Sequence, residues 1–184
     1  GYQIADACIW DAGALVVVVG RERGDLYRLR AGRLEELVEQ TDETPGRHDQ
    51  GGWSQSRYRR HIEKLVHDHL KEVAELLERQ VRRLRGPRVV VVASEETRAE
   101  FEAALPSEAR KAVVGWTTAE AHASPAELLA VVEPLLDSWR AEREADAVER
   151  WREEAARNGR AAAGWGPTLE AASDARVDLL LFED

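Results

Sequence analysis

Two glycines, a tryptophan, a serine and a glutamine form the part of the sequence whose residue types could do chemistry. The segment runs Gly51-Gly52-Trp53-Ser54-Gln55 and stands where a polar stretch meets a long helical pattern. Glycines let a backbone turn sharply and approach another molecule closely. Gln55 offers an amide, and Trp53 offers an aromatic face with one N–H donor. The pattern predicts a flexible tip that presents these two side chains at the start of a helix.

A cationic helix follows this tip. Its local net charge is +3, although the chain has a formal net charge of −9. Cations at a helix N-terminus oppose the helix dipole, and an unfavourable placement without structural gain indicates function. A polyanion would offset the charge, because each phosphate contact adds salt-dependent affinity. The structural alternative is a plain turn before a solvated helix face. The charged residues counted here are Arg57, Arg59, Arg60, Glu63, Lys64, Asp68 and Lys71.

Other candidate sites are weak. His61, His67 and His69 do not have the i, i+4 spacing of a helical metal site, so no metal site is expected. His48 and Asp49 lie near Ser54 in the sequence, but adjacency along the chain is no evidence for a nucleophilic triad. No dinucleotide-binding glycine pattern follows a strand, and no cofactor is expected.

Composition excludes several classes of protein. The chain has 184 residues, 35 acidic and 26 basic, with 43% hydrophobic residues. This excludes a wholly disordered chain, and the acidic balance excludes a generally basic nucleic-acid binder. The single Cys8 cannot form an internal disulfide, which favours a reducing, cytoplasmic compartment. The longest apolar run, Ala14–Val19, is far shorter than the roughly 18 residues that span a bilayer, so no membrane partner is expected.

The first half of the chain predicts strands, a loop and one long helix. Short strands, among them the apolar run Ala14–Val19, fill the first 40 residues. Thr41–Gly52 has no apolar anchor and predicts a mobile loop. Ser56–Arg85 has the 3.6-residue apolar period of a helix that ends at Gly86-Pro87. The apolar positions are Ile62, Leu65, Val66, Leu70, Val73, Leu76, Leu77, Val81 and Leu84.

The second half alternates strands and helices. Buried strands are predicted at Arg88–Ala93 and Ala112–Thr117, with a helix at Glu95–Leu105 between them. Ser124-Pro125 opens a helix that extends toward Arg157 and that Pro134 should kink or divide. A final apolar strand, 177–182, must pair with another strand, so either it closes the first sheet or the domain to which it belongs is expected to be cut away from this chain. This order predicts an α/β fold with a mixed sheet.

The residues of the tip resemble a known family. Gly51-Gly52-Trp53-Ser54, followed by Arg57-Tyr58 and Arg60, is similar to the Gly-Gly-Gln-Ser-x-x-Arg-aromatic-x-Arg motif of archaeal and eukaryotic translation termination factors. Gly-Gly-Trp-Ser-Gln with a basic helix resembles their bacterial release-factor-like relatives, and the Gly52-x-x-Gln55 spacing resembles Vms-type peptidyl-tRNA hydrolases. Pelota belongs to the same superfamily. The resemblance implies an RNase H-like mixed sheet with flanking helices and one long helix after the tip loop.

The resemblance also implies a domain organisation. Residues 1–140 correspond to the central domain of these factors. Residues 141–184 correspond to a connector helix and the first elements of a C-terminal α/β domain, similar to kink-turn-RNA-binding proteins. An N-terminal domain and most of the C-terminal domain are then expected to be absent from this chain.

One departure affects the mechanism that the resemblance implies. Aligned through Ser54 and Arg57, the catalytic Gln of the termination factors is replaced by Trp53, and Gln55 lies two residues later. Catalytic geometry does not tolerate a displacement of several ångströms, so the mechanism of the termination factors cannot be transferred to Trp53. The Vms-type spacing makes Gln55 the candidate instead. Gly51 and Gly52 would shape the tip, and Gln55 would orient water against the peptidyl-tRNA ester. Contacts to rRNA or tRNA are expected from Trp53, Ser54, Arg57, Tyr58, Arg59, Arg60 and Lys64.

Three functions remain open at this point. The first is hydrolysis of peptidyl-tRNA at the peptidyl-transferase centre of the ribosome. The second is non-catalytic binding to the ribosome in rescue or hibernation, as some relatives do. The third is an acidic α/β module for protein interaction in which the loop is simply flexible. Trp139, Trp151 and Trp165 are expected to be packing residues.

Overall fold

The computed structural model describes residues 2–5, 13–37 and 55–183, and side chains at 13–37 and 63–182. The chain forms two compact units. One unit contains Ala12–Leu135, and the other combines residues 1–11 with Leu136–Asp184. The predicted loop Thr41–Gly52 lies outside the described residues.

The larger unit is built on a five-stranded mixed sheet. Its strands are β2 (Ala14–Val19), β3 (Gly24–Arg30), β4 (Arg33–Glu36), β5 (Arg88–Val92) and β6 (Val113–Thr117), in the order β4-β3-β2-β5-β6. The β2–β3 and β3–β4 pairs are antiparallel, whereas β2–β5 and β5–β6 are parallel. Parallel neighbours need a crossover, and helices supply both crossovers here. The predicted mixed α/β fold is confirmed.

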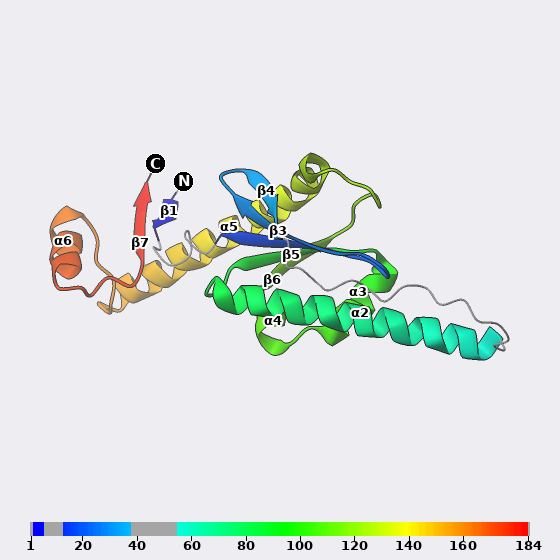
Figure 1. Ribbon diagram of the computed structural model, residues 1–184. Helices are drawn as coiled ribbons and strands as arrows, with labels where there is room; N and C mark the ends of the chain where they lie inside the picture. The colour runs from blue at the N-terminus through cyan, green and yellow to red at the C-terminus, as the bar shows by residue number, and fades with distance from the viewer. Residues whose placement is uncertain (1, 6–12, 38–54, 184) are drawn as a thin grey trace. The chain divides into compact units, whose positions relative to one another are not determined.

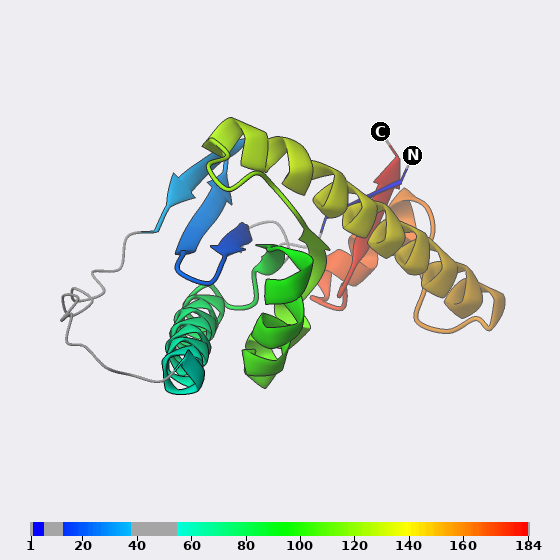
Figure 2. The same ribbon diagram turned by 90° about the vertical axis from the view of Figure 1, so that its right-hand side faces the viewer.

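Helices cover both faces of this sheet (Figures 1 and 2). The long helix α2 (Gln55–Arg83) packs beside α3 (Glu95–Ala104) and α4 (Ser107–Ala112) on one face. The first turns of α5 (Pro125–Ala156) cross the other face, as Figure 2 shows in a view along α2. This layering follows from the apolar runs of β2 and β5, which are buried on both sides.

The central strands divide their side chains between two cores. Leu15 and Val17 of β2 join a cluster with Leu70 and Leu77 of α2. Neighbouring residues point to the opposite face, where α5 begins. On that side a Cβ at Gly115 of β6 would lie 3.1 Å from a methyl carbon of Leu135 in α5. Other residues in the α2-side cluster are Val19, Leu26, Val66, Val73, Ala74, Val81, Val89, Val91, Ala93, Phe101, Leu105, Ala109 and Ala112.

Two predicted helix starts are confirmed by their caps. The backbone N–H of Thr97 donates to Ser94 Oγ at 3.3 Å and begins α3. The N–H and the hydroxyl of Ser124 both donate to Glu127 Oε2 at 2.7 Å, which forms a capping box before α5. These hydrogen bonds lower the pKa of Glu127.

The structure differs from the sequence-based expectations at several elements. A short helix, α4, follows Pro106 where none was predicted, because six residues are too few to show a helical period. Pro134 lies inside α5 without dividing it. The final strand, β7 (Leu180–Glu183), does not join the main sheet, but pairs antiparallel with β1 (Tyr2–Ala5) in the smaller unit. That unit also contains α6 (Trp165–Ser173).

A glycine fixes the distance between α2 and the sheet. A Cβ at Gly24 of β3 would lie only 2.3 Å from Val73 Cγ2 and 3.5 Å from His69 Cε1. Val73 is β-branched and stiff within a helix, so its methyl group cannot easily move aside. Gly24 therefore lets α2 pack directly on β3.

We expect Gly24→Ala to lower the free energy of unfolding by about 1–3 kcal/mol, because the added methyl group overpacks the contact with Val73. Chemical denaturation monitored by circular dichroism measures this change. Gly20→Ala is the matched control, since its Cβ would have no neighbour closer than 3.8 Å. Val73→Ala should remove part of the cost when combined with Gly24→Ala. Equal stability of the Gly24 and Gly20 variants would show that the contact does not set the packing distance.

Candidate functional site

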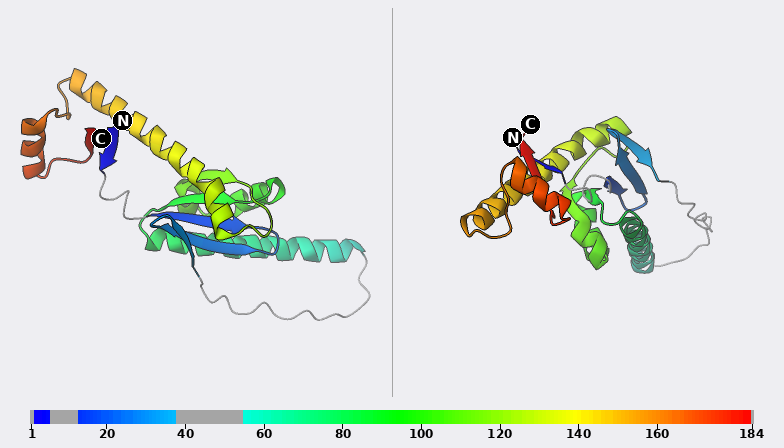
Figure 3. Two further views of the ribbon diagram at one scale, coloured as in Figure 1. Left: turned by 90° about the horizontal axis from the view of Figure 1, so that it is seen from above. Right: turned by 90° about the vertical axis from the view of Figure 1, so that its left-hand side faces the viewer.

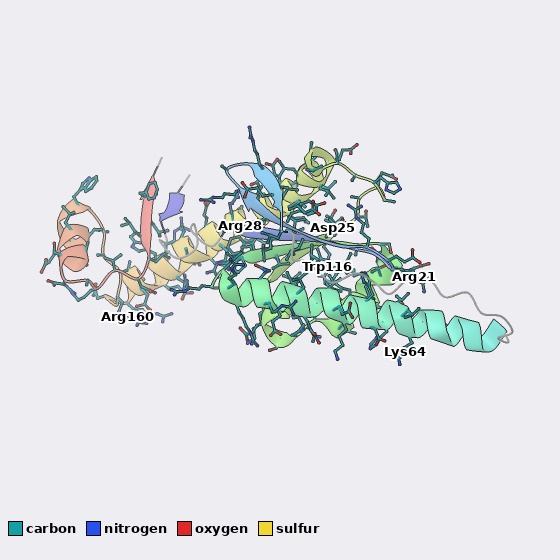
Figure 4. All side chains as sticks on the ribbon, viewed as in Figure 1. Arg21, Asp25, Arg28, Lys64, Trp116 and Arg160 are labelled. Carbon is teal, nitrogen blue, oxygen red and sulfur yellow. The ribbon has the colours of Figure 1, made fainter. Side chains whose placement is uncertain are left out.

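The start of α2 extends beyond the part of the helix that packs on the sheet (Figure 1). Val66 is buried, whereas Lys64 and Leu65 just before it are exposed. Among the described side chains, the apolar stripe therefore contacts the core from Val66 onward. The preceding turns form a projecting arm in the larger unit, near whose base Lys64 is labelled in Figure 4.

The predicted site residues are distributed along and before this arm. Gly51, Gly52, Trp53 and Ser54 lie outside the described residues. Gln55 is the first residue of α2, so the structure places it at the free end of the helix. The remaining predicted RNA contacts lie within the next three turns, namely Arg57, Tyr58, Arg59, Arg60 and Lys64.

The end of the arm is electropositive for two reasons. The first turn of α2 contains no acidic residue. In addition, the first four N–H groups of any helix lack partners within the helix, which places a partial positive charge there. Positions 57, 60 and 64 follow the spacing that keeps residues on one face of a helix. Such an end can bind a phosphate, a carbonyl oxygen or a developing oxyanion.

A cavity of about 240 Å³ lies at the base of the arm, beside Val66 and Leu70. It combines the guanidinium of Arg21 with two carboxylates and a strip of apolar surface. The hydroxyl of Thr97 contacts Ser94 Oγ at 3.0 Å, so this hydroxyl already serves the cap of α3. The residues that line the cavity are Arg21, Val66, Leu70, Glu96, Thr97 and Glu100.

Sequence reasoning missed this cavity. Its walls come from the turn after β2, from α2 and from the start of α3. Only the parallel pairing of β2 with β5 brings that turn and α3 to the same end of the sheet. Gly20 and Gly24 around Arg21 were a local signal for a tight turn, but not for its neighbours.

Polar contacts hold the β2–β3 turn in place. Arg23 forms an ion pair with Asp25 and donates a hydrogen bond to the backbone carbonyl of Ala121 at 2.5 Å. This connects the turn to the segment between β6 and α5. Burial raises the pKa of the neighbouring Tyr27, and the carboxylate of Asp25 adds to the effect. The turn beside the cavity is thus held by Arg23 through two contacts, one to Asp25 in β3 and one to Ala121.

Two histidines of α2, His67 and His69, have described side chains. His67 is exposed, and His69 is half-buried against Gly24 with a buried Nε2 that makes no hydrogen bond among the described residues. Within the described part of the chain, no three His, Cys, Asp or Glu side chains are grouped as a metal site requires.

The tryptophans behave differently from one another. The expectation that Trp165 is a packing residue is wrong, since 86% of its surface is exposed. Trp151 Nε1 donates to the carbonyl of Ala162 at 3.0 Å. In the larger unit, Trp116 meets the ring of Phe101 edge-to-face, and the guanidinium of Arg98 lies 5.2 Å from the Trp116 ring centre.

The described helices include none with the length and apolar character needed to cross a bilayer.

Comparison with known proteins gives a family match. Residues 3–137 match the family model of bacterial archaeo-eukaryotic release factor family 10. The match covers most of the chain, including α2 and every strand of the main sheet.

Two curated relatives share a shorter stretch. The chain is 40% identical over 60 residues to peptide chain release factor subunit 1 of Aeropyrum pernix. It is 38% identical over 60 residues to the protein of that name from Saccharolobus solfataricus. Each match covers 33% of this chain and only 16% of the relative.

A solved structure supports the fold. The crystal structure of the archaeal translation termination factor aRF1 superposes with a TM-score of 0.51 at 18% sequence identity. The superposition covers 80% of this chain and 42% of that protein. Given the extent of the family match, the chain belongs to bacterial archaeo-eukaryotic release factor family 10.

Proposed function

We propose that this protein acts on the ribosome as a release-factor-like translation factor that hydrolyses peptidyl-tRNA, with Gln55 at the reacting ester. The observation that carries the proposal is the position of Gln55 as the first residue of α2, on an arm that projects from the sheet. Membership of a release-factor family supports the ribosome as the proposed partner. The chain spans less than half of the relatives that it matches, so the activity of the whole protein is part of the proposal.

The proposed reaction is the addition of water to the carbonyl carbon of the ester that joins the peptide to tRNA. The ester C–O bond then breaks, the ribose hydroxyl leaves with a proton, and the peptide carboxylate is released. The Gln55 amide would hold the attacking water through its donor and acceptor atoms. Gly51 and Gly52 would let the backbone approach the ester closely. Unpaired N–H groups at the start of α2 would stabilise charge that develops on the carbonyl oxygen.

The cations of the arm would supply binding to rRNA and tRNA. Arg57, Arg59, Arg60 and Lys64 would contact phosphates, and Trp53 would stack on a base, which contributes about 1–3 kcal/mol per stacked base. Ser54 and Tyr58 would add polar contacts beside them. No cofactor or metal takes part in this scheme. A cytoplasmic location follows from the ribosomal partner.

The proposed domain organisation extends the same reading. Residues 1–140 would act as the central domain that carries the arm. Residues 141–184 would form the connector and the first elements of a C-terminal domain, with further domains supplied by the full-length protein.

A second candidate function is favoured by Trp53. This residue occupies the position of the motif at which termination factors have their glutamine. A factor that binds the peptidyl-transferase centre without cleavage, for rescue or hibernation, would need the cations and the stacking ring, but not the amide. The two functions therefore differ in the role of Gln55 alone.

Reversing three charges on the arm tests binding. We expect Arg57→Glu, Arg59→Glu and Arg60→Glu together to abolish co-sedimentation of the full-length protein with ribosomes. For the unmodified protein, log affinity should fall with log salt with a slope near −0.9 for each phosphate contact. The control reverses Arg150 and Arg152 of α5 and Arg157 directly after it, all exposed, and should sediment like the unmodified protein. Binding that is insensitive to salt would contradict a phosphate-contacting arm and favour the protein-interaction module.

Replacing the amide tests catalysis. We expect Gln55→Ala to slow peptide release from ribosomes carrying a nascent chain by at least about 100-fold, because the amide acts mainly in the transition state. Ribosome affinity should stay within about twofold of the unmodified value. Trp53→Ala should instead weaken binding and leave the release rate of the bound complex nearly unchanged. If the unmodified full-length protein binds ribosomes and releases no peptide, the rescue or hibernation function replaces hydrolysis.

A further inference from the structure

Five arginines gather at the end of the sheet opposite the projecting arm. We call this group the arginine patch: Arg28 and Arg30 of β3, Arg33 of β4, and Arg83 and Arg85 at the end of α2. All but Arg28, which is half-buried, are exposed. Figure 4 shows Arg28 at the other end of the sheet from Arg21.

Strand register brings the two parts of this patch to the same level. Leu29 pairs with Ala14, and Ala14 pairs with Arg88 just after the end of α2. The backbone N–H of Arg88 also donates to the carbonyl of Gly13 at 3.2 Å. Two strand spacings of about 4.8 Å therefore separate the end of β3 from the chain that leaves α2.

The packing of α2 against β3 independently places the two parts of the patch at the same level. Gly24 of β3 lies against His69 and Val73, and β3 and α2 run alongside each other (Figure 3). Arg30 lies six residues further along β3, which is about 20 Å, or about 13 residues of helix. This places Arg30 level with the last turn of α2, which contains Arg83.

The side chains also share a side of the sheet. Leu15 belongs to the α2-side core and pairs with Arg28, so Arg28 and Arg30 face the α2 side. Arg33 pairs with Arg30 across the β3–β4 turn. Arg83 follows His69 by two spacings of seven residues, which keeps it on the flank of α2 that meets β3.

The charge of this patch is poorly balanced by acidic groups. Glu35 stands opposite Arg28 in the register, which leaves five cations against one anion. Arg30, Arg33, Arg83 and Arg85 have no acidic partner among the described residues. Nε of Arg28 is buried, and within the described part of the chain it makes no hydrogen bond.

Stability alone does not account for this arrangement. Cations at a helix C-terminus interact favourably with the helix dipole, which explains Arg83 and Arg85. Arg30 directly opposite Arg33 is instead a like-charge pair, which destabilises a hairpin. An unfavourable pair without structural gain indicates a ligand that offsets the repulsion.

We propose that the arginine patch is a second RNA-binding surface, which binds the phosphate backbone of a structured RNA about 40 Å from the tip along α2. Arginine suits this role, because its planar guanidinium can donate two hydrogen bonds to one phosphate. Ribosomal RNA is the source of the ligand if the proposed function is correct, and to that extent the inference rests on it. The RNA-binding property itself is testable without ribosomes.

The test uses the chain with its arm already reversed by Arg57→Glu, Arg59→Glu and Arg60→Glu, so that the remaining affinity comes from elsewhere. Fluorescence anisotropy with an RNA duplex of about 16 base pairs, between about 50 and 200 mM salt, measures binding. We expect this protein to bind the duplex. Adding Arg30→Glu and Arg33→Glu should raise Kd at least tenfold and reduce the salt slope by about 2.

Two controls keep the result interpretable. Arg150→Glu and Arg152→Glu on α5 make the same charge change and should alter Kd less than about twofold. Arg30→Gln and Arg33→Gln remove the charge without adding repulsion inside the hairpin, and should also weaken binding relative to that control. Thermal unfolding of each variant confirms that the protein tested is folded.

Several outcomes would overturn the proposal. The first is an arm-reversed protein that does not bind the duplex. The second is an equal loss of duplex affinity in the α5 control. The third is competition by polyglutamate that is as effective as competition by RNA, which would indicate an acidic protein partner. Failure here with intact ribosome binding by the unmodified protein would leave the proposed function standing. If the patch binds the duplex but the unmodified protein does not bind ribosomes, the RNA-binding patch stands and the proposed function fails.

Discussion

The packing of α2 on the sheet is the contact on which the rest of the structure depends. One apolar stripe, from Val66 to Val81, packs against the side chains of β2, β3 and β5 that face it. Gly24 allows the two backbones to approach closely at Val73. Among the described side chains of α2, the first buried one is Val66, and the helix continues before it as a projecting arm with Gln55 at its end.

The two ends of α2 differ in how their charged residues interact with the helix dipole. Its first turn has no acidic residue, and its last turn contains Arg82 and Arg83. The cations at the start oppose the helix dipole, whereas those at the end complement it. Opposing the dipole costs stability, and the buried stripe between the two ends compensates for that cost. An acidic chain can thus present two separate positive surfaces without being basic as a whole.

Elements with a clear period were predictable from the sequence, and contacts between distant segments were not. The apolar runs of β2 and β5 and the period of α2 give their type and position within a few residues. Helix α4 is too short for a period, and the partner of β7 is β1 at the other end of the chain. For the site, the sequence identifies the motif that ends in Gln55. The cavity at Arg21 and the arginine patch depend on strand register, which no local pattern encodes.

In the proposed function, the free end of α2 reaches the reacting ester on the ribosome. A photo-crosslinking phenylalanine analogue in place of Gln55 in the full-length protein tests this claim, because it reacts only with groups within a few ångströms. Irradiation of the ribosome complex, followed by mapping of the crosslinked nucleotides, locates position 55. We expect crosslinks to rRNA of the peptidyl-transferase centre and to the 3′ end of the peptidyl-tRNA. Crosslinks confined to ribosomal proteins, or to rRNA distant from that centre, would contradict the account.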